Sequence, residues 1–287
     1  MSTKKAVILS DSTCDLGSEL IEKYNIKINP LHVILGEKDL RDGIDVFPDD
    51  LYAYYKETGS LPKTAACNIA EHDSFIKENV PENMGAVYFT ISSELSTTHN
   101  AALLATEEME NVYVVDSRNL STGIGLQVLY AADLAEQGLS AKEIYDKVME
   151  IIDCVDASFV VDTLEYLHKG GRCSSVAALG ANLLKLHPLI QVKNGKMSAG
   201  KKFRGKISDV YIDYAKEKLS DLTDIDTKRV FITHSGCKEE HLKIVEDFVR
   251  SQLPASEILV TRAGSTVSVH CGYGTLGVLF IRKSPLK

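Results

Sequence analysis

The fold is decided by the stretch ISSELSTTHNAA, which spans residues 91–102. The apolar run AVYFT at residues 86–90 precedes it and predicts a buried strand. The run AALLATEEM at residues 101–109 overlaps its end and predicts a helix. Hydroxyl groups are therefore crowded into a strand-to-helix turn, where ligands bind in open α/β sheets. Backbone N–H groups at the helix start, together with these hydroxyls, suit an anion such as a carboxylate or a phosphate.

Ser96 and Thr97 in this turn have two interpretations that the residue types leave open. Either hydroxyl could simply cap the helix, because Ser and Thr are ordinary N-cap residues. Alternatively, Ser96 contacts a bound anion and Thr97 is a secondary candidate for the same pocket.

The first half of the chain predicts a three-layer α/β domain over residues 1–156. Strands are expected at residues 6–10, 26–33, 86–91 and 112–115. Helices are expected to begin near Ser18, Asp49, Ile69, Asn100, Gly123 and Ala141, the last behind a capping box at residues 140–143. This alternation indicates a parallel sheet with helices on both faces.

The second half, residues 157–287, predicts a mixed-sheet α+β domain. The expected elements are a strand at 158–162, a small-residue helix at 175–185, a hairpin around residues 193–196, helices at 207–219 and 239–252, a strand at 229–233 and three closing strands. The last two closing strands are expected near residues 266–270 and 275–282. In the first of these two, Ser268 and His270 would share one face, and Ser268 is a secondary pocket candidate.

Composition excludes several classes of protein. The 287 residues are 44% hydrophobic and 25% charged, and the net charge of −8 argues against binding nucleic acid or an anionic membrane surface. No apolar run approaches the ~20 residues that span a bilayer, so stable membrane insertion is not expected. The N-terminus has no signal-peptide core, and we expect a cytoplasmic protein. The six cysteines include no Cys-x-x-Cys pair, which fits reduced thiols, and neither a metal site nor a cofactor is expected.

Several other side chains are candidates for anion binding, each with a structural alternative. His270 precedes a glycine turn and can donate to an anion, or it can be a structural histidine. Thr64 lies in an extended segment after Pro62 and can instead be a loop threonine. Arg172 follows a Gly-Gly pair and Arg204 lies in a basic cluster, which suits either a phosphorylated or acidic partner or a solvated face. The hydrolase, dinucleotide and P-loop motifs are missing, so no catalytic residue is assigned.

Seven motifs in order resemble the DegV family of bacterial fatty-acid-binding proteins. They are DSTCDL at 11–16, PKTA at 62–65, SSELSTT at 92–98, VDS with STGIG at 115–125, LEYLHKGGR at 164–172, RG at 204–205 and HCGYG at 270–274. The resemblance implies a two-domain protein that holds one long-chain fatty acid, such as palmitate, stearate or oleate, in a tunnel between the domains.

The resemblance also implies roles for individual residues. The family's carboxylate contacts carry over to Thr64, Ser96 and His270. Family members of this type present the fatty acid to a separate ATP-dependent fatty acid kinase, which makes the acyl phosphate for phospholipid synthesis, and Arg172 and Arg204 would serve that encounter. The resemblance thus favours a lipid carrier over an enzyme.

The chain departs from the family pattern at the rim of the expected pocket. Ala65 replaces a serine, Thr97 replaces a glycine, and Ser265 and Tyr273 replace prolines. Two alternatives to the lipid carrier are kept. One is an acyl-transfer or hydrolytic enzyme that uses Ser96 and His270, and the other is a carrier of another small anion.

Overall fold

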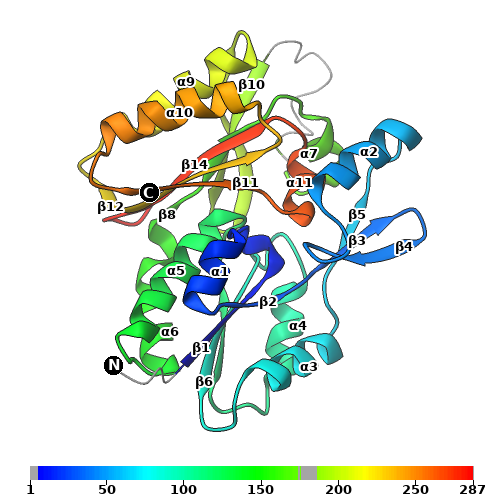
Figure 1. Cartoon of the computed structure of the whole chain (residues 1–287), viewed down its shortest axis with the longest axis vertical. Coiled ribbons are helices and arrows are strands. Elements are labelled where there is room, and N and C mark those ends of the chain that lie inside the picture. Colours follow the sequence, from blue (N-terminus) through cyan, green and yellow to red (C-terminus); the bar gives the residue numbers. More distant parts are fainter. Residues whose placement is uncertain (1–5, 174, 176–185, 287) are drawn as a thin grey trace.

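The structure is a computed structural model that describes residues 6–173, 175 and 186–286 (Figure 1). Over these residues the strands form three sheets, of four, seven and three strands. The helix predicted at residues 175–185 lies outside the described residues, except for Ser175. Among the described helices, none combines the length and the apolar character needed to cross a membrane.

The first sheet is parallel, as the alternation of strands and helices predicts. Its strands are β1 (Ala6–Asp11), β2 (Lys27–Asn29), β6 (Gly85–Thr90) and β7 (Val112–Asp116). They lie in the order β2-β1-β6-β7, and every neighbouring pair is parallel. The carboxyl ends of β1 and β6 therefore meet at one edge of the sheet, where the hydroxyl-rich turn follows β6.

Helices cover both faces of this sheet. They are α1 (Ser18–Tyr24), α3 (Ile69–Asn79), α4 (Thr98–Ala105), α5 (Thr122–Glu136) and α6 (Ala141–Ile151). Side chains of β6 alternate between the faces: Val87 and Phe89 pack in the core with α5 and α6, whereas Ala86 and Tyr88 pack with α3 and α4. Figure 1 shows α1, α5 and α6 on one side and α3 and α4 on the other. The predicted three layers are present.

A small antiparallel sheet that the sequence did not predict carries Thr64. It comprises β3 (His32–Leu35), β4 (Lys38–Arg41) and β5 (Lys63–Ala65), and α2 (Pro48–Thr58) follows β4. The single strand predicted at residues 26–33 is therefore wrong, because it is two strands in two sheets. Pro30 separates them, and a proline cannot donate a ladder hydrogen bond.

The second large sheet is mixed, as predicted. Its strands are β8 (Val155–Asp156), β9 (Ser158–Val160), β10 (Leu186–Lys193), β11 (Lys196–Arg204), β12 (Ile225–Ser235), β13 (Glu257–Arg262) and β14 (Thr275–Arg282). The order is β11-β10-β9-β14-β12-β13, with β8 beside β14, and only β12 and β13 pair in parallel. The predicted hairpin is confirmed, since Asn194 and Gly195 adopt φ of 52° and 79° between β10 and β11.

The two faces of the mixed sheet have different partners. Helices α9 (Ile207–Lys218) and α10 (Glu239–Gln252) cover the outer face, at the top of Figure 1. On the inner face, Phe231 and Leu279 belong to the same hydrophobic core as Leu129 of α5. The mixed sheet is therefore packed directly on the parallel-sheet half.

The strand predicted near residues 266–270 is wrong, because that segment forms the helix α11 (Ser265–Cys271). Alternation of Val267, Val269 and Cys271 with polar residues suggested a strand, yet all three are buried on the helix. The polar residues of α11 are buried as well, except for His270, which is partly exposed. The alternating pattern therefore did not mark one solvent-facing side.

The N-terminus of α11 is bound by two aspartates from the first half of the chain. Asp42 accepts hydrogen bonds from the backbone N–H groups of Ser265 at 2.8 Å and Thr266 at 3.1 Å. Asp15 accepts one from Gly264 at 2.9 Å. These N–H groups have no partner inside the helix, and a carboxylate also complements the helix dipole. Long-range capping thus stabilises a helix that local sequence does not predict.

Replacing Asp42 with alanine should destabilise the protein through this cap. The N–H groups of Ser265 and Thr266, and the hydroxyl of Ser12 that donates at 3.0 Å, would lose a buried acceptor. We expect the free energy of unfolding to fall by roughly 2–4 kcal/mol in urea denaturation. The control Asp45→Ala removes an exposed carboxylate that pairs with its near neighbour in the chain, and should have a much smaller effect. Equal losses in both variants would contradict the role given to the cap.

Candidate functional site

A cavity of about 480 Å³ lies where the small sheet, the hydroxyl-rich turn and α11 meet. Its lining includes the three predicted carboxylate contacts, which come from separate elements: Thr64 from β5, Ser96 from the turn before α4, and His270 from α11. Apolar side chains such as Leu31, Leu95 and Met197 complete much of the wall. The volume is that of a typical small-molecule pocket.

Thr64 and His270 are already in contact. The Thr64 hydroxyl lies 2.9 Å from Nε2 of His270. The register between β3 and β5 sets the position of Thr64, which pairs with Val33, and Val33 packs with Val269 of α11 in a shared core cluster. The strand and the helix are thus held together by packing as well as by this hydrogen bond.

The imidazole of His270 is neutral at pH 7. Burial, with a further contribution from the positive charge of Arg172, lowers its pKa from the ordinary value of 6.5 to about 4. Among the described residues, its buried Nδ1 atom has no hydrogen-bond partner. At pH 7 the ring is therefore a neutral hydrogen-bonding group and not a cation.

The Gly-Gly-Arg motif lies against this histidine. A Cβ atom on Gly170 would stand 2.6 Å from Nδ1 of His270, so only glycine allows α7 (Glu165–Gly170) to approach the ring so closely. Gly171 ends the helix with φ of 67°. Arg172 then donates to the carbonyl oxygen of Gly170 at 2.8 Å and lines the cavity. The motif therefore brings a cation beside the neutral histidine.

Of the two interpretations of Ser96, capping of the helix is confirmed, whereas its contact with an anion stays a prediction. Its Oγ accepts a hydrogen bond from the backbone N–H of Thr98 at 3.2 Å, at the start of α4, and it also lines the cavity. Thr97 occupies the N-cap position without a side-chain cap hydrogen bond; it is exposed and lines the cavity as well. The hydroxyl-rich turn thus caps a helix and faces a pocket at the same time.

Buried groups behind the turn hold it in place. Asp11 accepts a hydrogen bond from the backbone N–H of Ile91 at 2.7 Å, and burial raises the pKa of this carboxyl to about 6. Ser92 donates to the carbonyl oxygen of Gly195 at 2.8 Å, which ties the turn to the β10–β11 hairpin. Asp15 accepts from the hydroxyl of Ser121 at 2.5 Å, and its pKa is raised well above the usual range by burial.

The two remaining candidates, Ser268 and Arg204, are not among the described residues that line the cavity. Ser268 is fully buried against Ser235 and is not among the described residues that line the cavity, so its place as a pocket candidate is not supported. Arg204 is exposed at the end of β11 and does not line the cavity either. Arg172 and Arg204, which the sequence treated as one pair outside the head-group site, thus occupy different environments.

The four departures from the family pattern also fall in different places. Ala65 and Thr97 line the cavity. Ser265 donates through its hydroxyl to the carbonyl oxygen of Val46 at the start of α11, whereas Tyr273 is 49% exposed. The wall of the cavity is therefore altered at two positions, both of them exposed at its rim.

A second, smaller cavity lies beside the first, next to the mixed sheet. It measures about 30 Å³ and is almost wholly apolar, with Phe159 and Leu279 in its wall. Leu120, Val267 and Cys271 line both cavities. The two cavities are therefore neighbours that these three side chains adjoin.

The aspartates that organise this site are functional residues that the sequence patterns did not predict. Asp11 and Asp15 were quoted only as parts of a motif, and Asp42 was not singled out. The available signal was an Asp residue at the carboxyl end of a predicted strand, where polar groups gather in α/β sheets.

Comparison with known proteins identifies a family for residues 5–283, which match the family described as "Uncharacterised protein, DegV family". A protein of Thermotoga maritima named fatty acid-binding protein is 32% identical over 285 residues, covering 95% of this chain and 96% of that protein. Both matches extend over nearly the whole chain.

Solved structures have the same fold. A DegV family protein from Thermus thermophilus, described for its fatty acid binding, superposes with a TM-score of 0.89 at 28% identity and covers 97% of this chain and 99% of that one. The fatty acid kinase (Fak) B3 protein of Streptococcus pneumoniae, loaded with linoleic acid, superposes with a TM-score of 0.82 at 21% identity and covers 98% and 99%. At that identity the second likeness concerns the fold.

His270 should titrate near pH 4 in the ligand-free protein. Unfolded histidine takes up its proton near pH 6.5, whereas the folded protein keeps His270 neutral down to about 4, so this residue lowers the free energy of unfolding as pH falls between those values. The loss should approach about 3 kcal/mol at pH 4. Imidazole NMR of wild type and His270→Asn identifies the resonance, and the variant should lose that part of the pH dependence. A resonance that titrates near 6.5 would contradict a desolvated ring.

Proposed function

This chain belongs to the DegV family of fatty-acid-binding proteins, and from that premise we propose that it binds one long-chain fatty acid with its carboxylate at Thr64, Ser96 and His270. The observation that carries the proposal is the convergence of these three side chains, from three separate elements, on one largely apolar cavity. Palmitate, stearate and oleate are the class of ligand that we expect.

The acyl chain would lie in a tunnel between the two halves. From the polar end it would pass Leu120, Val267 and Cys271, which line both cavities, and enter the apolar space beside Phe159 and Leu279. Burial of a chain of about 16 carbons contributes on the order of 10 kcal/mol, at about 0.8 kcal/mol per methylene. That gain is large enough for the lipid to remain bound through purification.

The carboxylate needs partners because a buried, unpaired charge is costly. The hydroxyls of Thr64 and Ser96 and the Nε2–H of His270 can each donate to one of its oxygens. The charge itself is balanced by Arg172, whose guanidinium is always protonated and which lines the same cavity. We therefore include Arg172 in the head-group site.

The geometry favours a binding protein over an acyl-transfer enzyme. A serine nucleophile requires a histidine base within hydrogen-bond reach and a group that orients that base. In the described part of the chain, Ser96 bonds to Thr98, while His270 bonds to Thr64 and has no partner at Nδ1. Neither contact of a catalytic triad is formed.

Delivery to a separate fatty acid kinase is the further part of the proposal. The rim of the cavity includes exposed residues such as Ala65 and Thr97, so the carboxylate end lies near the surface. Arg204 lies outside the cavity and is free to contact the kinase or the phosphoryl group, which guanidinium binds well. The similarity to fatty-acid-binding relatives supports a fatty acid as the ligand, and the exposed Arg204 supports contact with a kinase.

Fatty-acid content and affinity test the head-group site. Native and denaturing mass spectra of protein from a bacterial host should differ by one saturated or monounsaturated fatty acid per chain. Ser96→Ala and His270→Ala should each weaken binding by roughly 1–3 kcal/mol, because each removes one donor to a charged group. The control Ser251→Ala changes an exposed serine on α10 and should bind normally. Unchanged dissociation constants in both site variants would place the carboxylate elsewhere.

The two arginines should separate binding from delivery. Arg204→Ala should keep the fatty-acid affinity of the wild type and slow kinase-dependent formation of acyl phosphate, with the loss partly in association. Arg172→Ala should weaken binding as well, because the cavity loses its cation. The control Arg250→Ala removes an exposed arginine that pairs with Glu246 on α10. Added salt should slow the formation of acyl phosphate more with the wild type than with Arg204→Ala. If the kinase phosphorylates fatty acid presented by Arg204→Ala at the wild-type rate at both low and high salt, the basic cluster is only a solvated face.

A further inference from the structure

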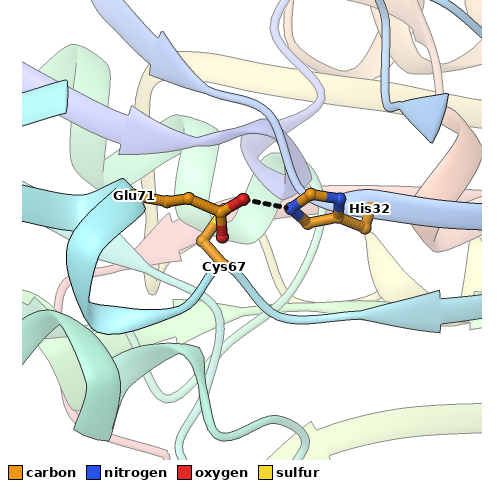
Figure 2. Close-up of side chains that lie close together, drawn as sticks. All are labelled: His32, Cys67 and Glu71. Carbon is orange, nitrogen blue, oxygen red and sulfur yellow. Dashed lines mark ion pairs between the residues drawn. The ribbon is translucent and has the colours of Figure 1, made fainter. Parts of the chain in front are cut away.

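Three potential metal ligands converge outside the fatty-acid cavity. They are His32 of β3, Cys67 in the segment between β5 and α3, and Glu71 in the first turn of α3. One ligand atom of each lies within 4.8 Å of the other two, and Nε2 of His32 is 3.2 Å from Oε1 of Glu71. Figure 2 shows the three side chains directed toward a common point.

We propose that Nε2 of His32, Sγ of Cys67 and Oε1 of Glu71 bind one zinc ion, with water as the fourth ligand. A histidine, a cysteine and a carboxylate are all ligands that Zn²⁺ accepts, and three protein ligands plus water is an established tetrahedral arrangement. The thiolate and the imidazole together favour zinc over magnesium or calcium, which prefer sets made of oxygen alone.

The surroundings of His32 resemble those of a metal-bound histidine. Its Nδ1 lies 2.7 Å from a carboxylate oxygen of Asp39, which leaves Nε2 to face Glu71 and Cys67. Metal-bound histidines commonly donate their second ring N–H to a carboxylate in this way, which fixes the tautomer and the ring orientation. Asp39 would therefore be a positioning residue for the site.

Glu71 is fixed by its role in capping α3. Its Oε2 accepts the backbone N–H of Asn68 at 2.7 Å, as part of a capping box. Oε1 remains on the side of His32. One carboxylate thus holds the helix start and presents its other oxygen to the cluster, so a metal would find this ligand already ordered.

Zinc binding would require Cys67 to lose its proton and a hydrogen bond. The side chain is buried, and its thiol lies 3.2 Å from the carbonyl oxygen of Pro30, to which it donates. Burial and the nearby charge of Glu71 raise the pKa of the thiol to about 12. Zinc binding would break this weak hydrogen bond and release the thiol proton to solvent, and the cation would neutralise the thiolate. Glu71 and Pro30 also help to line a groove of about 400 Å³ beside the cluster.

The location gives the site a structural role in the fatty-acid pocket. His32 pairs with Ala65 in the β3–β5 register, and Ala65 follows Thr64 directly. A zinc ion would therefore join β3 and the segment after β5 to α3, and would fix the strand that presents Thr64. The inference concerns metal binding alone and does not depend on the proposed lipid ligand.

Metal-binding measurements on tag-free, chelator-treated full-length protein test the site. Titration with Zn²⁺ should give one ion per chain, and Co²⁺ should produce a near-ultraviolet thiolate-to-metal band. Cys67→Ser should lose that band, whereas the matched control Cys154→Ser, which changes a buried cysteine of the 3-10 helix η2 (Ile152–Cys154), should keep it. Asp39→Asn should bind zinc roughly 10- to 100-fold more weakly.

His32→Gln provides a second ligand variant, in case Cys67→Ser does not fold. It should bind zinc at least as weakly as Asp39→Asn, because it removes a direct ligand. The competing explanation is a hydrogen-bond network in which His32 only bridges Asp39 and Glu71. Absence of stoichiometric zinc binding by the wild type, or a cobalt band that persists in Cys67→Ser, would overturn the proposal in favour of that network.

Discussion

The site depends on one physical constraint, which is that the N-terminus of α11 is held by carboxylates from the other half of the chain. Asp15 and Asp42 bind three consecutive backbone N–H groups there. Burial of Asp15 is costly, as its raised pKa indicates, but the helix dipole and the N–H donors offset part of that cost. Because α11 has fewer than two turns, fixing its start also fixes His270 near its end.

The cavity consequently lies where the small sheet, the turn after β6 and α11 meet. Thr64 comes from the small sheet, Ser96 from the turn after β6, and His270 from the second half. Two hydrogen bonds hold this turn in place, one accepted by the carboxyl of Asp11 and one by the carbonyl oxygen of Gly195 in the hairpin. Such a site is preorganised by packing and buried hydrogen bonds, so a ligand entering it need not assemble the polar groups.

The sequence predicted those features that local patterns encode. Apolar runs and helical periodicity predicted the parallel sheet and its helices, and Asn194-Gly195 predicted the hairpin. The small sheet was missed because its strands are three or four residues long, and because β4 and β5 are largely polar. The helical state of α11 could not be predicted, since its cap comes from Asp42, more than 200 positions away. The three carboxylate contacts came from family resemblance, and their convergence required the structure.

Electrostatics explains why the two arginines cannot have equivalent roles. His270 is neutral at pH 7, so it adds no positive charge where a fatty-acid carboxylate would lie. Hydroxyls and a neutral imidazole can satisfy the hydrogen-bonding capacity of that carboxylate but not its charge. Arg172 is the one Lys or Arg side chain among the described residues that line the cavity, so under the proposed function its charge would help to retain the carboxylate. Arg204 is not needed there, and an exposed guanidinium outside the cavity can act on a partner without loosening the bound lipid.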